Sequence, residues 1–223
     1  GDRIDLGSEA VATMGVQEVR FVDGTVWTAA DLVAMALAPT AGDDSIYGTS
    51  LSDGLTGAGG DDQLIGLAGN DTLAGGAGVD LLQGGEGDDS YRFAPGDDQD
   101  VILDTGGAAD ELLLGAGILP TDIRVVQSGD GSAIILLIGD QGDRVRIDDA
   151  LGAGRIETIR FADGTAWSVA DLLARAASGL DDRLFGDNVA DVLAGGLGND
   201  RLSGRGGDDE YRFAAGDGRD IIR

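Results

Sequence analysis

The 223-residue sequence contains no cysteine, no histidine and no lysine. Without cysteine, the chain has neither disulfides nor cysteine-ligated zinc. Without histidine, it lacks a common ligand of transition metals and has no Ser-His-Asp triad. No apolar run approaches the ~20 residues of a transmembrane span, and no signal peptide opens the chain. We therefore expect neither an enzyme active site nor a transmembrane segment.

Positive charge is also scarce: the sequence has 41 acidic and 15 basic residues, which gives a net charge of −26. A chain this acidic is unsuited to nucleic acid or to an anionic membrane. Disorder is equally disfavoured, because 42% of the residues are hydrophobic. Of the acidic residues 35 are Asp, and there are 40 Gly. Acidic turns of this kind offer oxygen ligands, which suit hard cations such as calcium.

Asp recurs every nine residues in two separate runs. The first run is Asp44, Asp53, Asp62, Asp71, Asp80 and Asp89, and the second is Asp182, Asp191, Asp200 and Asp209. An apolar residue follows each Asp by two positions, and Gly precedes most of them by two and by five positions. The unit reads GGxGxDxUx, where U is apolar, and its clearest copies are 75–83, 84–92 and 195–203. A flexible Gly/Asp linker would not keep an apolar residue in register.

This period predicts a solenoid. Six residues rich in Gly and Asp favour a tight turn, because Gly adopts positive φ at little cost. The three residues x-U-x then form a short strand whose central side chain points inward. Two units close a coil of 18 residues, and stacked coils form two parallel sheets around a thin core of U residues. One coil cannot bury its own U residues, so several are needed for stability.

The repeats at 42–110 and 177–223 resemble the haemolysin-type, or repeats-in-toxin (RTX), calcium-binding family. The resemblance implies a mostly β fold, a parallel β-roll (right-handed β-solenoid), with each ion between loops one coil apart. Both runs end in a longer segment that matches the family's terminal element and adds Asp100 and Asp220. The implied ligands are the carboxylates of Asp44, Asp53, Asp62, Asp71, Asp80, Asp89, Asp100, Asp182, Asp191, Asp200, Asp209 and Asp220. The implied carbonyl ligands belong to Gly57, Gly60, Gly66, Gly69, Gly75, Gly76, Gly78, Gly84, Gly85, Gly87, Gly195, Gly196, Gly198, Gly204 and Gly207.

The expected number of calcium ions is roughly six to nine, at about six oxygen ligands each. The Asp pairs are one coil apart: 44 with 62, 53 with 71, 62 with 80, 71 with 89, 80 with 100, 182 with 200, 191 with 209 and 200 with 220. A further coil at Asp110, with Leu112 pointing inward, has weaker support. Leu51, Leu180 and Val189 replace the Gly two residues before an Asp, and bulky residues resist positive φ. We expect their loops to be distorted and weakly occupied or empty.

The remaining segments form a longer duplication, since residues 16–37 match 156–177. The predicted units are a strand-turn-helix element at 1–38, β-roll blocks at 39–111 and 178–223, and an antiparallel β element with a helix at 112–177. The stretch 112–167 resembles the haemolysin-type calcium-binding related domain. Thr28 and Ser168 are predicted helix N-caps. Trp27 and Trp167 precede these helices and are either core residues, the favoured interpretation, or ligand platforms.

These features predict a calcium-binding structural module of a secreted bacterial RTX protein, toxin-like in its repeats and extracellular. The family resemblance implies that the chain folds on binding calcium after type I secretion, so the secretion machinery is an expected partner of the parent protein. The alternative is an accessory or substrate-binding region of an extracellular enzyme (lipase, protease or polysaccharide-modifying) or an adhesin. Contact with a glycan or a cell surface is an open question at this point.

Overall fold

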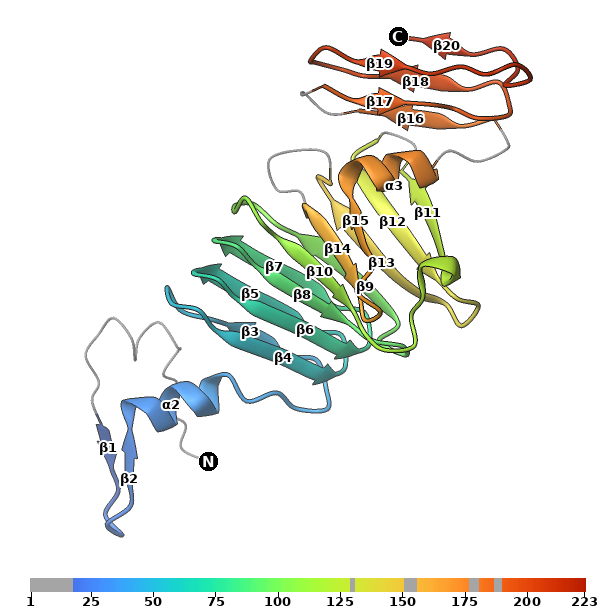
Figure 1. The fold of residues 1–223 in the computed structure, drawn as a ribbon. Helices are drawn as coiled ribbons and strands as arrows, with labels where there is room; N and C mark the ends of the chain where they lie inside the picture. The colour runs from blue at the N-terminus through green and yellow to red at the C-terminus, as the bar shows by residue number, and fades with distance from the viewer. Residues whose placement is uncertain (1–17, 129–130, 151–155, 177–180, 187–189) are drawn as a thin grey trace.

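The computed structural model describes residues 18–128, 131–150, 156–176, 181–186 and 190–223. The chain is mostly β, and its strands stack in coils, as the nine-residue period predicts (Figure 1). Residues 1–17 and the substitutions Leu180 and Val189 lie outside the described residues. Among the described residues, no helix is both long and apolar enough to cross a membrane.

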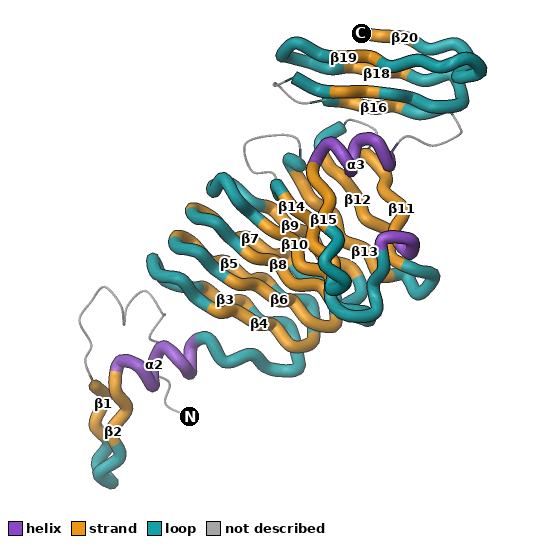
Figure 2. The backbone as a smooth tube through the Cα atoms, in the orientation of Figure 1, coloured by secondary structure: helices purple, strands orange, loops and turns teal. Residues whose placement is uncertain are grey.

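The first block consists of parallel strands that alternate between two sheets. Their bounds are β3 (Ser45–Tyr47), β4 (Gly54–Gly59), β5 (Gln63–Ala68), β6 (Thr72–Ala77), β7 (Leu81–Glu86), β8 (Ser90–Phe93), β9 (Gln99–Leu103) and β10 (Glu111–Leu114). One sheet contains β3, β5, β7 and β9, and the other contains β4, β6, β8 and β10. From β3 to β8, adjacent strands pair 18 residues apart, for example Leu55 with Leu73, so that equivalent repeat positions stack directly. The last two pairings are wider, at 20 residues for β7 with β9 and 21 for β8 with β10. The loops gather at the two ends of the stacked strands (Figure 2).

The U residues form the core between the two sheets. In the first block they are Ile46, Leu55, Leu64, Leu73, Leu82 and Tyr91, and all are at most 3% exposed. They belong to one cluster with the apolar side chains of the following segment. At roughly 25 cal/mol per Å² of buried apolar surface, each such leucine contributes about 2 kcal/mol before the entropy cost of ordering the chain.

Strands β4 to β7 have six residues each, twice the three predicted from x-U-x. Pairing continues from the strand into the turn, since Ala58 also pairs with Gly76 and Gly59 with Ala77. Ladder pairing thus continues into the turn, although Ala58 and Gly76 adopt positive φ values of 78° and 99°. The sequence pattern marks only the residues with an inward side chain, and therefore underestimates the length of the strands.

The segment after the first block extends both sheets. Strand β13 (Asp143–Asp148) pairs parallel with β9, and β14 (Thr158–Phe161) pairs parallel with β10. Within the sheet, β12 (Ala133–Ile138) lies next to β13, and β11 (Ile123–Gln127) lies next to β12; both pairings are antiparallel. The 3-10 helix Pro120–Asp122 precedes β11 in the chain. Strand β15 (Ala166–Ser168) follows β14 and leads into α3 (Val169–Ala176). The predicted boundary between 111 and 112 therefore falls inside β10, and the two units share continuous sheets.

The second block repeats the coil pattern with shorter strands. It contains β16 (Arg183–Phe185), β17 (Val192–Leu193), β18 (Arg201–Ser203), β19 (Glu210–Tyr211) and β20 (Ile221–Ile222). The side chain of Gln127 in β11 exchanges two hydrogen bonds with the main chain of Phe185, each 2.9 Å long. This exchange joins the second block to the edge strand of the preceding sheet. Figure 1 shows the strands of the second block beyond α3.

The N-terminal element forms a hairpin, β1 (Glu18–Arg20) and β2 (Val26–Thr28), followed by α2 (Ala29–Ala36). Thr28 caps α2 through a capping box with Asp31. Ser168 and Asp171 make the same reciprocal hydrogen bonds at the start of α3. Both helices therefore begin after the residues that the sequence marks as N-caps.

Candidate metal centre

The predicted aspartates stack in columns, with one main-chain hydrogen bond between successive members. We name Asp44, Asp62, Asp80 and Asp100 the first column, and Asp53, Asp71, Asp89 and Asp110 the second column. In each pair, the N–H of the earlier Asp donates to Oδ1 of the Asp one coil later. The distances are 2.7 Å (44 to 62), 2.7 Å (53 to 71), 2.8 Å (62 to 80), 2.7 Å (71 to 89), 3.4 Å (80 to 100) and 2.7 Å (89 to 110). The structure thus brings together every pair that the nine-residue spacing predicts in this block. It also shows the further coil expected at Asp110, with Leu112 buried.

The second carboxylate oxygen of most column members is buried without a hydrogen-bond partner. These orphaned oxygens are Oδ2 of Asp62, Asp71, Asp80, Asp89, Asp100 and Asp110, together with those of Asp104 and Asp200. Each of these side chains is at most 3% exposed. A buried charge without a partner is strongly unfavourable. The orphaned oxygens are the donor type that calcium prefers, so the residues present fit a calcium ion.

Glycine at the first repeat position gives these oxygens their space. A Cβ atom on Gly66 would lie 2.6 Å from the carbonyl oxygen of Gly84 and closer still to Oδ2 of Asp71. The same convergence occurs at Gly57, where a Cβ would meet Oδ2 of Asp62 and the carbonyl oxygen of Gly75. A carboxylate oxygen of one loop and a carbonyl oxygen from the loop one coil later therefore face the same small space. Two oxygens of this kind, from neighbouring coils, are what an inter-loop calcium site requires.

Other predicted carbonyl ligands fall into distinct groups. The carbonyls of Gly66, Gly75, Gly84 and Gly204 lie next to an Asp Oδ2. Those of Gly60, Gly69, Gly85, Gly87 and Gly198 lie against the glycine one coil later, and that of Gly78 accepts the N–H of Gln99. For Gly57, Gly76, Gly195, Gly196 and Gly207 a ligand role stays a prediction.

Six carboxylates of the columns have raised pKa values, mainly because burial disfavours their charged form; they are Asp62, Asp71, Asp80, Asp89, Asp100 and Asp110. Burial raises the pKa of Asp80 and of Asp89 from 3.8 to about 6, and that of Asp110 to about 7. At Asp100, burial and then the charge of Asp80 raise the pKa to about 8. Bound cations would reverse this balance, since a nearby positive charge favours the ionised carboxylate.

The first member of each column is held differently. Oδ2 of Asp44 accepts hydrogen bonds from the N–H and Oγ1 of Thr40, at 2.7 and 2.9 Å. Oδ2 of Asp53 accepts the equivalent pair from Thr49, at 2.6 and 2.9 Å. Leu51, in the same loop, does not adopt a positive φ. These threonine caps satisfy the carboxylates where the columns begin, so Asp44 and Asp53 have no orphaned oxygen.

The second column continues past the point that the nine-residue period reaches. The N–H of Asp110 donates to Oε2 of Glu157, which directly precedes β14, at 2.8 Å. Asp104, which directly follows β9, brings a third carboxylate to Asp89 and Asp110. One oxygen from each of the three lies within 4.8 Å of the others, and among the described residues this is the single such group of three. The nine-residue spacing does not identify Asp104 or Glu157, because neither residue keeps it.

The second block repeats the arrangement of the first. The N–H of Asp182 donates to Oδ1 of Asp200 at 2.7 Å, that of Asp191 to Asp209 at 3.2 Å, and that of Asp200 to Asp220 at 3.0 Å. Asp200 is fully buried, and burial raises its pKa. The predicted pairs of this block are thus also adjacent in the structure.

The two tryptophans differ in their surroundings. Trp167 is 3% exposed and packs edge-on against Phe161, with ring centroids 4.7 Å apart, and Arg175 lies 4.0 Å from its ring. Trp27 is half-buried and contacts Phe21 in the same way, at 4.5 Å. Trp167 is therefore a core residue, which agrees with the favoured interpretation of this position.

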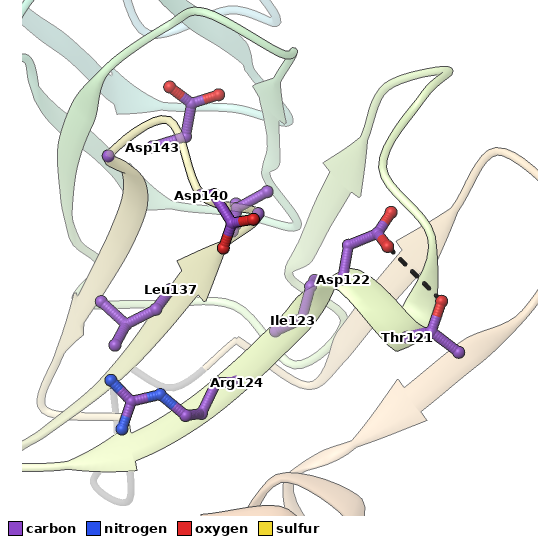
Figure 3. Close-up of a pocket in the computed structure, with 10 residues that line it drawn as sticks. Thr121, Asp122, Ile123, Arg124, Leu137, Asp140 and Asp143 are labelled. Atoms are coloured by element: carbon purple, nitrogen blue, oxygen red, sulfur yellow. Dashed lines mark hydrogen bonds between the residues drawn. The ribbon is translucent and has the colours of Figure 1, made fainter.

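A separate hollow of about 660 Å³ lies at the start of β11, the end of β12 and the turn that leads into β13 (Figure 3). Asp122, Asp140 and Asp143 line it, and the carboxylates of Asp122 and Asp143 have structural partners. Asp122 accepts the N–H of Leu119 at 3.0 Å, and Asp143 accepts the N–H of Gly96 at 2.8 Å. Arg124 lines the same hollow, so its charge is mixed. The hollow does not resemble the carboxylate columns.

Comparison with known proteins agrees with the repeat geometry. The profile of the RTX calcium-binding nonapeptide repeat matches residues 56–91, 177–211 and 185–222. The profile of the haemolysin-type calcium binding protein related domain matches residues 134–171. No curated protein is similar enough to this sequence to count as a match.

Several solved structures are similar to parts of the chain. The AlgE6R3 subunit of the mannuronan C5-epimerase of Azotobacter vinelandii is 33% identical, over 57% of this chain and 82% of that subunit, with a TM-score of 0.40. The AlgE6R2 subunit of the same enzyme is 32% identical, over 52% and 92%, with a TM-score of 0.38. The extracellular lipase LipA of Serratia marcescens is 20% identical, over 82% of this chain and 29% of the lipase, with a TM-score of 0.27.

Proposed function

We propose that this chain, which belongs to the family of RTX calcium-binding nonapeptide repeat proteins, is a structural module whose β-roll folds when calcium binds. The observation that carries the proposal is the row of buried Asp Oδ2 atoms without partners. Calcium, when bound, supplies the positive charge that these oxygens lack. The chain's own residues contribute the carboxylates, the loop carbonyls and the glycines that leave room for them.

Folding and binding are coupled because the columns are unfavourable on their own. Successive carboxylates are stacked at the coil spacing of ~4.8 Å, and like charges at that distance repel. Among the described residues, no column aspartate forms an ion pair, so arginine does not neutralise the charge of the columns. Binding free energy therefore becomes folding free energy. We propose roughly six to nine ions, at sites that require about six oxygens each.

We also propose that the parent protein is secreted and that this module folds outside the cell. The acidic composition and the calcium-dependent columns support export as an unfolded chain, because calcium is scarce inside cells and abundant outside them. Type I secretion machinery is the partner that this route requires. We further propose that the module itself has no catalytic activity, since its carboxylates are used in the columns and it has no histidine.

Circular dichroism during a calcium titration, followed by chelation, tests the proposal. We expect β structure to form cooperatively with calcium and to disappear with chelator. The double variant Asp71→Ala with Asp80→Ala removes one orphaned carboxylate from each column, so it should raise the calcium midpoint and reduce cooperativity. Asp140→Asn, which changes an exposed carboxylate in a turn, serves as the control. A fold that ignores chelator, or an unchanged titration of the double variant, would contradict the proposal.

A second candidate is an accessory region of an extracellular polysaccharide-modifying enzyme. The 33% identity to a subunit of a mannuronan C5-epimerase favours it. A glycan array probed in the presence of calcium distinguishes the candidates. Calcium-dependent binding that is lost on Trp27→Ala, the more exposed of the two tryptophans, would favour this second function. Absence of binding would leave the structural role.

A further inference from the structure

The carboxylate of Asp104 occupies a place that glycine holds elsewhere in the roll. Strand β9 pairs with β7 so that Leu81 is opposite Val101 and Leu82 is opposite Ile102. Continuing this register by two residues places Asp104 opposite Gly84, the first glycine of its repeat. The N–H of Gly85 donates to Oδ1 of Asp104 at 3.4 Å, in agreement with this alignment. The last coil of the block therefore carries a carboxylate where earlier coils leave space.

The space beside Gly84 already contains oxygen atoms. A Cβ on Gly84 would meet Oδ2 of Asp89 and the hydroxyl of Tyr91, which accepts the N–H of Gly84 at 2.7 Å. One coil later, a Cβ on Gly107 would meet both carboxylate oxygens of Asp110. Asp104 thus adds its carboxylate between Asp89 and Asp110, which are already adjacent in the second column. One oxygen from each of the three carboxylates lies within 4.8 Å of the other two.

Each of the three carboxylates in this cluster has a buried oxygen without a hydrogen-bond partner. Their exposed fractions are 1% for Asp89, 2% for Asp104 and 1% for Asp110, and the Oδ2 atom of each is without a partner. Within the described parts of the chain, no arginine forms an ion pair with any of them. Three negative groups cannot remain together in a buried space without a cation or protons.

We propose that Asp89, Asp104 and Asp110 form a three-carboxylate calcium site that binds more tightly than the two-carboxylate sites of the columns. The inference rests on the proposed calcium-dependent folding and specifies where binding is strongest. Affinity for calcium rises with the number of charged ligands and with the rigidity of the site. The site is rigid because Asp104 directly follows β9 and Asp110 directly precedes β10. Through the bond from Asp110 to Glu157, it also connects the first block to β14.

The test compares the wild-type chain with Asp104→Asn and with the control Asp140→Asn. Each protein is loaded with calcium and dialysed against buffers of decreasing free calcium, and bound calcium per chain is measured by atomic emission. We expect wild type and the control to retain one ion after the others have dissociated. Asp104→Asn should release that ion at free calcium at least about tenfold higher. Superimposable curves for wild type and Asp104→Asn would overturn the proposal, whereas absence of any calcium binding would instead overturn the proposed function.

Terbium provides a readout that does not depend on the folding of Asp104→Asn. Tyr91 is adjacent to the site, so excitation of its ring should sensitise emission from terbium bound there. A trivalent ion should also occupy the site of highest negative charge first. We expect the first equivalent of terbium to give strong emission in wild type and in Tyr211→Phe, the matched change in the second block. In Tyr91→Phe the emission should fall by more than half, and equal emission in Tyr91→Phe would overturn the proposal.

Discussion

The N–H of Asp71 donates to Oδ1 of Asp89 at 2.7 Å, while Oδ2 of Asp89 is buried and has no partner. One oxygen of the carboxylate thus joins two coils, and the other is available to a cation. The same division occurs in Asp71, which accepts the N–H of Asp53 through Oδ1. The structural and metal-binding roles of one side chain can therefore be separated by mutation.

Asp71→Asn should retain the hydrogen bond and weaken the calcium site. The amide keeps an acceptor oxygen for Asp53 but replaces the orphaned oxygen with an NH₂ group, which does not bind calcium. We expect a folded protein whose calcium midpoint, measured by circular dichroism, is several-fold higher. Asp61→Asn is the control, because exposed Asp61 also accepts a main-chain N–H, that of Val79 at 2.9 Å. Equal shifts in the two variants would contradict a specific role for Asp71.

Gly66→Ala should be strongly destabilising even though Gly66 does not adopt a positive φ. The added methyl group would lie 2.6 Å from the carbonyl oxygen of Gly84 and would displace the carboxylate of Asp71. We expect a loss of about 2 kcal/mol or more in the free energy of unfolding, measured by urea titration in calcium. Gly54→Ala should change stability little, because a Cβ there meets no atom within 4 Å. Similar losses in both variants would indicate a general effect of glycine on the backbone.

The sequence predicted the periodic part of this molecule well. The spacing of nine placed Leu73 in the core and Asp71 beside Asp89, because each coil repeats the same environment and one residue type fills each position. Glycine at the first repeat position can also be predicted from the spacing, because a side chain at Gly66 would overlap the carboxylate of Asp71. In a regular repeat, the spacing along the sequence is therefore enough to predict which residues are buried and which lie next to each other.

Prediction failed where the coils change length. Asp104 and Glu157 join the second column by insertions of irregular length, and only strand pairing brings Glu157 to Asp110 across 47 residues. The boundary placed after residue 111 also depended on the end of the period, whereas the sheets continue through β13 and β14. A long-range register of this kind is set by backbone pairing and leaves no periodic trace in the sequence.

Trp167→Ala should reduce stability, since the ring is buried against Phe161 and Arg175. We expect a loss of about 3–5 kcal/mol in the free energy of unfolding in saturating calcium, measured by urea titration. Trp27→Ala should cost less, because Trp27 is only half-buried in its hairpin and helix. A loss for Trp27→Ala equal to that for Trp167→Ala would show that the two copies of the duplicated element are packed equally well.

Without calcium, the roll should be more stable in acid than at neutral pH. The folded-state pKa values of Asp80, Asp89, Asp110 and Asp100 are about 6, 6, 7 and 8, all above the ordinary 3.8. A carboxyl whose pKa is raised by folding favours the folded state below pH 3.8, and this contribution is lost as the pH rises through the folded-state value. The stability contributed by these groups should therefore decline between about pH 4 and pH 8. We expect chelator-treated protein to regain β structure, measured by circular dichroism, as the pH falls from 8 to 4.5.

Asp100→Asn separates this effect from the general decrease in net charge. Its uncharged side chain removes a group whose folded-state pKa is about 8, so the ion-free variant should keep more β structure at pH 8 than the wild type. Its signal should also change less between pH 7 and 8, whereas Asp140→Asn should follow the wild type. In calcium the order should reverse, because Asp100 then contributes a ligand oxygen and its loss weakens binding. An ion-free wild-type signal that stays constant from pH 8 to 4.5 would show that protons cannot replace the cation in these columns.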